Sequence, residues 1–243
     1  MSGKVVLVTG GSGLIGSEII RELNASGYRP INLDLHVENN LVKGTWKCDI
    51  TEPTSVDETI ASIVDEFGSI DGLVNNAYPR TSDWGKPVDQ IEIESWRKNV
   101  DMQMNSVFYI TQRVLSHMVK QNSGSVVNIA SIYGVVGNDP TLYENTGISA
   151  PAAYSAIKGG LINLTRYLAS HYGQHGVRVN ALSPGGIFDH QDPKFVEAYE
   201  RRVPLRRMGN PNDIAPVVQF LLSDHAKYIT GQNIIVDGGY TAQ

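Results

Sequence analysis

The stretch KVVLVTGGSGLIG, residues 4–16, decides the fold. Residues 4–9 form a short apolar, β-branched run typical of a strand, and residues compatible with a helix continue to about Ala25. Gly10, Gly13 and Gly16 let the backbone turn tightly, and the helix N-terminus offers free N–H groups and a positive dipole end to phosphates. The stretch therefore predicts a phosphate-binding turn, although a plain strand-to-helix turn has the same pattern.

A carboxylate follows this turn at the sequence spacing expected for a dinucleotide-binding site. Residues 31–34 (INLD) read as a second strand, which ends in Asp34, eighteen residues beyond Gly16. A carboxylate there can bind ribose hydroxyls, and it would repel the 2′-phosphate of NADP. Because no Arg or Lys stands directly beside Asp34 in the sequence, we expect NAD rather than NADP. A capping or turn aspartate is the alternative interpretation.

Strand and helix patterns alternate along the rest of the chain. This alternation predicts an α/β fold with a doubly wound parallel sheet (a Rossmann fold), about seven strands with helices on both faces, and a single domain over residues 1–243. There is no internal repeat, low-complexity tract or linker. Further strands are expected at 44–48, 71–75, 124–130, 177–182 and 232–236. Helices are expected at 53–67, at 91–120 with room for an interruption near its start, around Tyr154 and Lys158 to about Tyr172, and at 211–222; a variable stretch covers 184–209.

Composition narrows the possible partners. The 41% hydrophobic and 19% charged fractions describe an ordinary globular protein, and a net charge of -5 argues against a nucleic-acid or anionic-membrane surface. The single cysteine, Cys48, is expected to be a small buried hydrophobe in a reducing compartment. With no signal-peptide pattern and no apolar run long enough for a bilayer, we expect a cytoplasmic protein. His171 and His175 have the spacing of metal ligands, but no third ligand is evident, so no metal is expected.

The segment YSAIK places Tyr154 and Lys158 four residues apart in a predicted helix. That spacing puts the phenol and the ammonium on one face. A fixed cation favours the phenolate and lowers the tyrosine pKa, so the pair could move a proton. An exposed Tyr and Lys without a function are the alternative.

Taken together, the motifs resemble the short-chain dehydrogenase/reductase family, specifically its short single-domain branch, over essentially the whole chain. They stand in the order of that family: TGGSGLIG at 9–16, the strand-end Asp34, Asp49-Ile50, NNA at 75–77, NIAS at 128–131, YSAIK at 154–158, RVNALSPGG at 178–186 and YITGQNIIVDGGY at 228–240.

The resemblance implies an NAD(P)-dependent oxidoreductase acting on CH–OH groups. Tyr154 would exchange a proton with the substrate oxygen, Lys158 would hold the nicotinamide ribose and lower the tyrosine pKa, and Ser131 would hydrogen-bond the substrate oxygen. Gln103 occupies the position of the family's catalytic asparagine, with Asn99 and Asn105 nearby if the register differs. The implied cofactor-binding residues are Gly10, Ser12, Gly13, Leu14, Ile15, Gly16, Asp34, Asp49, Ile50, Asn76, Ala77, Tyr154, Lys158, Pro184, Gly185 and Ile187.

The chain departs from the family pattern in three places. The glycine spacing resembles that of the longer, sugar-nucleotide-modifying branch, and Gln103 replaces an asparagine. The distance from Ser131 to Tyr154 is also about ten residues greater than usual, and the excess is the insertion 138–149. We expect this insertion to lie over or beside the active site and to shape specificity.

Residues near the expected site are polar and aromatic, which suits a hydroxylated substrate such as a sugar or sugar derivative. The likeness to members from bacterial surface-sugar and flagellin-glycan pathways points the same way. A homodimer or homotetramer is implied as well. Two other functions stay open: an epimerase or dehydratase that retains NAD, suggested by the glycine spacing, and a non-catalytic dinucleotide-binding regulator, suggested by Gln103. The candidate substrate residues are Tyr78, Arg80, Trp84, Tyr133, Tyr143, Asp189 and His190, with a phosphate contact from Arg201, Arg202 or Arg206.

Overall fold

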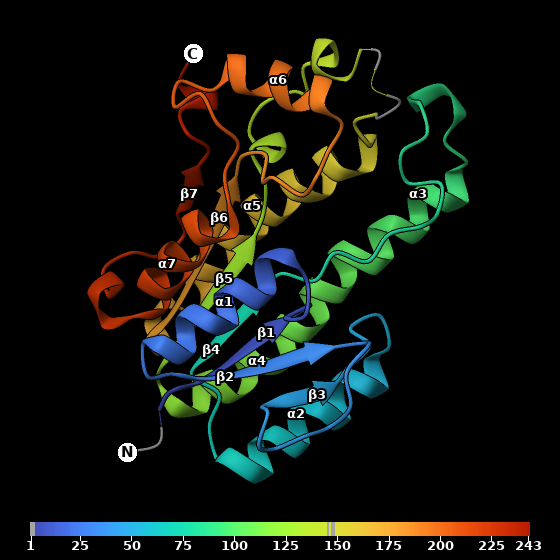
Figure 1. Ribbon diagram of the computed structural model, residues 1–243. Helices are drawn as coiled ribbons and strands as arrows, with labels where there is room; N and C mark the ends of the chain where they lie inside the picture. Colours follow the sequence, from blue (N-terminus) through green and yellow to red (C-terminus); the bar gives the residue numbers. More distant parts are fainter. Residues whose placement is uncertain (1–2, 145, 147–148) are drawn as a thin grey trace.

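A parallel sheet of seven strands forms the middle layer of the computed structural model, which describes residues 3–144, 146 and 149–243 (Figure 1). The strand order is β3-β2-β1-β4-β5-β6-β7, and each neighbouring pair is parallel. This confirms the predicted α/β fold. The strands are β1 Val5–Thr9, β2 Arg29–Asp34, β3 Thr45–Lys47, β4 Gly72–Asn75, β5 Gly124–Ile129, β6 Val177–Pro184 and β7 Asn233–Val236.

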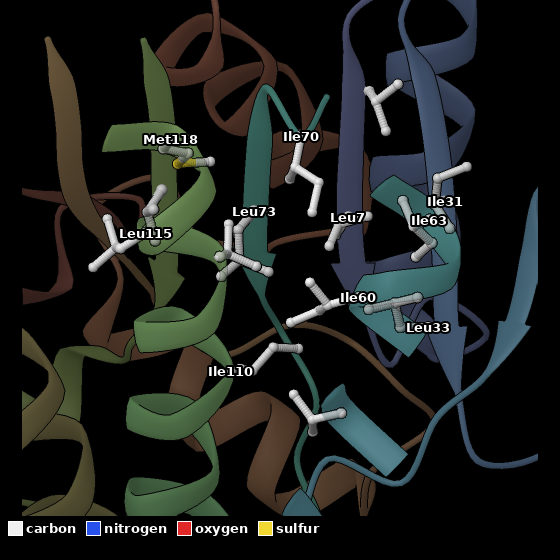
Figure 2. Packing of buried hydrophobic residues seen from close by; sticks show 14 of the residues in the cluster. Leu7, Ile31, Leu33, Ile60, Ile63, Ile70, Leu73, Ile110, Leu115 and Met118 are labelled. Atoms are coloured by element: carbon white, nitrogen blue, oxygen red, sulfur yellow. The ribbon is translucent and has the colours of Figure 1, made fainter. Parts of the chain in front are cut away.

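Helices cover both faces of the sheet because alternate residues of each buried strand point to opposite sides. On β1, Val5 and Leu7 face one hydrophobic cluster, whereas Val6 and Val8 face another. The first cluster contains residues of α2, α4 and α5, and Figure 2 shows its packing around Leu7. The helices are α1 Leu14–Ala25, α2 Pro53–Phe67, α3 Ile93–Val100, α4 Ser106–Gln121, α5 Ala152–Tyr172, α6 Pro193–Arg202 and α7 Pro211–Leu222.

Two regions differ from the sequence-based prediction. The expected helix at 91–120 is α3 and α4 joined through a π-helical segment, Asp101–Asn105. The variable stretch 184–209 contains α6, which the sequence pattern did not reveal. This helix begins at Pro193, where Asp192 caps the Lys194 N–H, but only Phe195 and Tyr199 are buried along it. Its low overall hydrophobicity, with only these two residues buried, explains why it was missed.

Two further expectations concern the single cysteine and membrane-spanning helices. Cys48 is a free, buried cysteine, as predicted. Within the part of the chain that the structure describes, no helix has the length and apolar character needed to span a bilayer.

Candidate active site

The site forms where the strand order reverses. From β1 the chain builds the sheet toward β2 and β3, and then crosses to β4 on the other side. In open α/β sheets such a reversal leaves a crevice at the carboxyl ends of the strands, and ligands bind there. The glycine turn after β1 and the NNA motif after β4 meet at this crevice.

The glycine turn after β1 is packed too tightly for side chains at two positions. Gly10 has a φ of 63°, and a Cβ on Gly16 would lie 2.2 Å from the Gly10 carbonyl oxygen. The Asn76 side-chain amide donates 3.0 Å hydrogen bonds to the carbonyls of Thr9 and Gly10, and Ala77 N–H donates to the Thr9 hydroxyl at 3.0 Å. The two strand ends are thus fastened together around the turn.

The N-terminus of α1 presents main-chain donors to this crevice. Leu14, Ile15 and Gly16 stand in the first turn of α1, where N–H groups have no intrahelical acceptor. Gly13 is the N-cap and supplies no capping side chain, and a Cβ there would touch only the Gly10 carbonyl. Free donors, a positive dipole end and an open approach suit the pyrophosphate of a dinucleotide. The residues present therefore fit such a cofactor.

Asp34 ends β2 beside the same turn. Its carboxylate accepts hydrogen bonds from the N–H groups of Ser12 and His36, each at 3.1 Å, so Asp34 is held toward the crevice. Its register partner on β3 is Lys47, an exposed residue that forms no ion pair with Asp34 within the described part of the chain. Sequence analysis missed this cation because only strand pairing brings it beside the carboxylate.

Asp49 and Ile50 follow β3 and complete this side of the crevice. Asp49 accepts hydrogen bonds from the N–H and the hydroxyl of Thr51, at 2.9 and 2.7 Å, and its own N–H donates to Ser55. Ile50 is buried in the core beneath. The turn is therefore held in place by local hydrogen bonds at the end of β3.

Ser131, Tyr154 and Lys158 line one pocket of about 270 Å³. Ile15 and Asn76 from the cofactor side line the same pocket, so the crevice and the pocket are continuous. The Lys158 ammonium lies 5.5 Å from the centroid of the Tyr154 ring, and it donates a 2.7 Å hydrogen bond to the Ile129 carbonyl. The structure thus brings together three of the four residues predicted to be catalytic.

Burial controls the acid–base properties of this group. It lowers the pKa of Lys158 to about 8, and it raises the pKa of Tyr154 from its ordinary value. A hydrogen bond with the Ser131 hydroxyl acts against the second effect and lowers the Tyr154 pKa. Without a cofactor, the tyrosine is therefore held in its protonated form, which is the form that can donate a proton to a carbonyl.

Gln103, the fourth predicted catalytic residue, lies in the π-helical segment between α3 and α4. Its side chain is 3% exposed, and neither its amide oxygen nor its amide nitrogen has a hydrogen-bond partner among the described residues. Short π-helical segments concentrate at functional sites because they shift one turn of the backbone out of register. The neighbouring Asn99 is occupied elsewhere, since its amide holds Thr81.

Pro184, Gly185 and Ile187 form the wall after β6. Gly185 N–H donates to the Val236 carbonyl at 2.9 Å, and all three residues line the pocket with Tyr154. A Cβ on Gly185 would lie 2.9 Å from both Asp237 Cα and the Tyr199 hydroxyl. The turn is therefore close to the pocket and rigid.

Aromatic side chains form much of the remaining pocket wall. The Tyr78 ring meets the Tyr154 ring edge-on with the centroids 5.5 Å apart, and Trp84, which does not line the pocket, meets Tyr154 edge-on from behind this contact at 6.2 Å. The other aromatic lining residues are Tyr133, Tyr143, and Phe195 and Tyr199 of α6, and the last two are not apparent from the sequence.

The described part of the insertion 138–149 packs against α6 (Figure 1), through Leu142 and Tyr143. Asp139 forms a 2.9 Å ion pair with Arg202, and the Tyr143 and Phe195 rings lie 5.4 Å apart. Residues 145, 147 and 148 of the insertion lie outside the described residues. The insertion therefore contributes Tyr143 to the pocket, in line with its expected position beside the site.

Several candidate substrate residues lie elsewhere. Asp189 and His190 are exposed and do not line the pocket. Arg80 lies over the Tyr78 ring, 5.1 Å from its centroid, at the outer edge of the site. Arg201 is paired with Glu197 and Arg206 donates to the Arg201 carbonyl, so the predicted phosphate contact has no support from these arginines. Among the described residues, no cluster of His, Cys, Asp and Glu could hold a metal ion.

Comparison with known proteins agrees with this geometry. The family model described as enoyl-(acyl carrier protein) reductase matches residues 15–241. The post-translational flagellin modification protein A of Campylobacter coli is 30% identical, with 99% of each chain covered, and the 3-oxoacyl-acyl-carrier-protein reductase of Thermotoga maritima is 33% identical, with 98% of each chain covered.

A solved structure is also closely similar. The short chain dehydrogenase of Leptospira borgpetersenii, with bound NAD+, is 34% identical and superimposes with a TM-score of 0.90 over 99% of this chain and 94% of that one. The matched model and the full-length relatives show that this chain belongs to the short-chain dehydrogenase/reductase family, and that it is a nicotinamide-dependent oxidoreductase.

Proposed function

We propose that this enzyme transfers hydride between NAD and a secondary alcohol or ketone of a polar, carbohydrate-like substrate, with Tyr154 as the general acid/base. The single observation that carries the proposal is the pocket that Ser131, Tyr154 and Lys158 share with Ile15 and Asn76 of the cofactor crevice. A substrate oxygen between Ser131 and Tyr154 would then lie beside the nicotinamide.

Each residue has one task in this mechanism. Ser131 donates a hydrogen bond to the substrate oxygen and stabilises the charge that develops on it. Tyr154 removes the hydroxyl proton during oxidation and returns it during reduction. Lys158 stays charged, holds the ribose hydroxyls and favours the phenolate form of Tyr154. The nicotinamide, when bound, supplies the hydride acceptor or donor. Gln103 holds a water that links Lys158 to solvent, which fits its unpartnered amide.

The substrate is proposed to be polar and uncharged. Among the described residues that line the pocket, Lys158 alone carries a charged side chain, whereas Tyr78, Tyr133, Tyr143 and Tyr199 contribute hydroxyl groups besides that of Tyr154. The nearby Arg202 is already paired with Asp139. The names of the two relatives point in different directions, one to flagellin modification and one to 3-oxoacyl-acyl-carrier-protein reduction, so the proposal of a hydroxylated substrate rests on the pocket chemistry.

NAD is the proposed cofactor because Asp34 faces the crevice at the end of β2. A homodimer or homotetramer, assembled through α4 and α5, is proposed from the family resemblance and from the exposed Phe108 and Tyr167 on these helices. We further propose that residues 1–243 act as one domain in the cytoplasm.

A substrate panel tests the function. Purified enzyme is incubated with NAD and sugars, sugar phosphates and polyols while NADH absorbance is followed, and bound cofactor is measured after purification. Tyr154→Phe should abolish nearly all turnover and keep NADH binding, whereas Tyr228→Phe, a change on a fully exposed side chain, should behave as the wild type. Turnover that survives Tyr154→Phe would contradict the mechanism. Retained NAD with no net NADH would instead identify an epimerase or dehydratase.

A further inference from the structure

Two phenol groups meet in the pocket next to the proposed reaction centre. Tyr143 donates a 3.1 Å hydrogen bond from its hydroxyl to the hydroxyl of Tyr133. Both residues line the pocket with Ser131 and Tyr154. The Tyr133 N–H donates to the Ser131 hydroxyl at 3.1 Å, so this phenol pair is tied directly to the serine expected to hold the substrate oxygen.

The phenol pair does not use all of its hydrogen-bonding capacity. A tyrosine hydroxyl has one proton to donate and two lone pairs that accept. One proton is used within the pair, whichever phenol donates it. The other can turn between the neighbouring Tyr240 hydroxyl and a ligand, and lone pairs remain on both oxygens. The pair can therefore donate to and accept from a hydroxyl group, which has the same two capacities.

Burial keeps the phenol pair uncharged. It raises the pKa of both Tyr133 and Tyr143 from the ordinary tyrosine value, so both hydroxyls stay protonated at neutral pH. A neutral donor and acceptor matches an alcohol better than it matches a carboxylate or a phosphate, which would find no cation there other than Lys158.

The phenol pair is also held in place before a ligand arrives. Tyr133 stands on a 3-10 turn, Ile132–Gly134, and Tyr143 ends another, Pro140–Tyr143. The Tyr143 ring packs against Phe195, and the ion pair between Asp139 and Arg202 fastens the second turn to α6. Preorganised groups lose little entropy when they bind a ligand.

We propose that the Tyr133–Tyr143 phenol pair binds a second hydroxyl of the substrate, distinct from the oxygen that reacts at Ser131 and Tyr154. The substrate is then a polyol or a hydroxyketone rather than a simple alcohol. This inference rests on the proposed function and deepens it, because it assigns to the insertion, through Tyr143, the selection of polyhydroxylated substrates.

The test compares ring alcohols that differ by one hydroxyl. Cyclohexanol and the 1,2-, 1,3- and 1,4-cyclohexanediols are oxidised with NAD, and the ratio of kcat/KM for each diol to that for cyclohexanol is measured. At least one diol should be preferred by wild type, and Tyr143→Phe and Tyr133→Phe should each reduce this preference about tenfold, the effect of losing one hydrogen bond to a bound hydroxyl.

Tyr172→Phe provides the matched control. Tyr172 is the last residue of α5, packs against the first hydrophobic cluster and does not line the pocket, so its hydroxyl lies apart from the phenol pair. Its removal should leave the diol preference within twofold of wild type. Equal efficiency of wild type toward cyclohexanol and every diol, or an unchanged preference in folded Tyr143→Phe and Tyr133→Phe enzymes, would overturn the inference while leaving the proposed function intact. If no alcohol shows turnover that depends on Tyr154, the proposed function itself fails.

Discussion

The Lys158 ammonium donates a 2.7 Å hydrogen bond to the main-chain carbonyl of Ile129, at the end of the strand that leads to Ser131. The hydrogen bond fixes the α5 helix, and with it Tyr154, to the carboxyl end of β5. The lysine is buried, and no carboxylate among the described residues pairs with it. Its charge therefore costs stability in the absence of cofactor.

This cost predicts an unusual pH dependence of folding. Burial lowers the pKa of Lys158 from 10.5 to about 8. Below about pH 8 the lysine is charged in both the folded and the unfolded protein, so the buried charge destabilises the folded protein to its full extent. Between the two values the unfolded chain keeps the proton and the folded chain has released it, so the free energy of unfolding rises with pH. Lys158→Met lacks this contribution. We expect the stability advantage of Lys158→Met over wild type to fall by about 1 to 3 kcal/mol between pH 7 and pH 10.

Urea unfolding of the cofactor-free proteins at several pH values measures this difference. A constant difference between wild type and Lys158→Met across that range would show that the lysine keeps its ordinary pKa in the folded protein. Lys227→Met is a suitable control, because Lys227 is exposed and should give no such pH-dependent difference.

Asp34 is predicted to set the preference for NAD. Removal of its carboxylate in Asp34→Ala takes away the acceptor for the ribose hydroxyls and also the repulsion of a 2′-phosphate, and it leaves Lys47 as a nearby cation. We expect NAD binding to weaken about tenfold or more, the effect of one hydrogen bond to a charged group, and NADP binding to improve. Binding of both cofactors to wild type, Asp34→Ala and the double variant with Lys47→Ala is measured by fluorescence titration. Stronger binding of NADP than of NAD by wild type would contradict the assignment.

Gly16 is predicted to be irreplaceable for a steric reason. A Cβ in Gly16→Ala would meet main-chain atoms of Gly10 and Gly11, at 2.2 and 2.8 Å, and these atoms cannot move without opening the turn. We expect a loss of about 1 to 3 kcal/mol of stability and at least a tenfold loss of NADH affinity. Gly173→Ala is the matched control, because a Cβ there meets nothing within 4 Å and its backbone is helical. That variant should keep wild-type affinity, and its stability should be unchanged or slightly higher. Melting curves and NADH titrations of both variants provide the comparison, and normal affinity in Gly16→Ala would rule out the steric argument.

The sequence predicted the sheet, its order of elements and most of the site because these depend on local patterns. Buried parallel strands show as apolar runs, and the carboxyl ends of the strands at Asp34, Asn75 and Ser131 carry the polar residues. Hydrophobic periodicity places a residue along the chain but does not show its neighbours across the sheet. Lys47 lies beside Asp34 only because β3 pairs with β2, so that cation was not visible in the sequence.

The part of the pocket wall formed by the insertion and α6 was harder to predict for a related reason. Its position depends on contacts between segments that are far apart in the sequence, such as the ion pair of Asp139 with Arg202 and the ring contact of Tyr143 with Phe195. The π-helical segment around Gln103 was equally hidden, since one extra residue in a turn leaves the hydrophobic spacing of a long helix almost unchanged.

Substitution of Gln103 should change the free energy of unfolding and kcat in opposite ways, which separates a structural role from a catalytic one. A buried amide with no partner among the described residues costs about 1 to 3 kcal/mol unless water satisfies it. Gln103→Met keeps nearly the same volume and removes the polar atoms, so we expect the variant to be as stable as wild type or more so. If the amide holds a relay water, kcat should nevertheless fall by about 10- to 100-fold, because proton transfer through Tyr154 and Lys158 loses its path to solvent. Gln103→Asn restores the amide and should recover part of the rate. Urea unfolding and steady-state kinetics on the three proteins give both quantities, and a Met variant that is stable and fully active would exclude Gln103 from the relay.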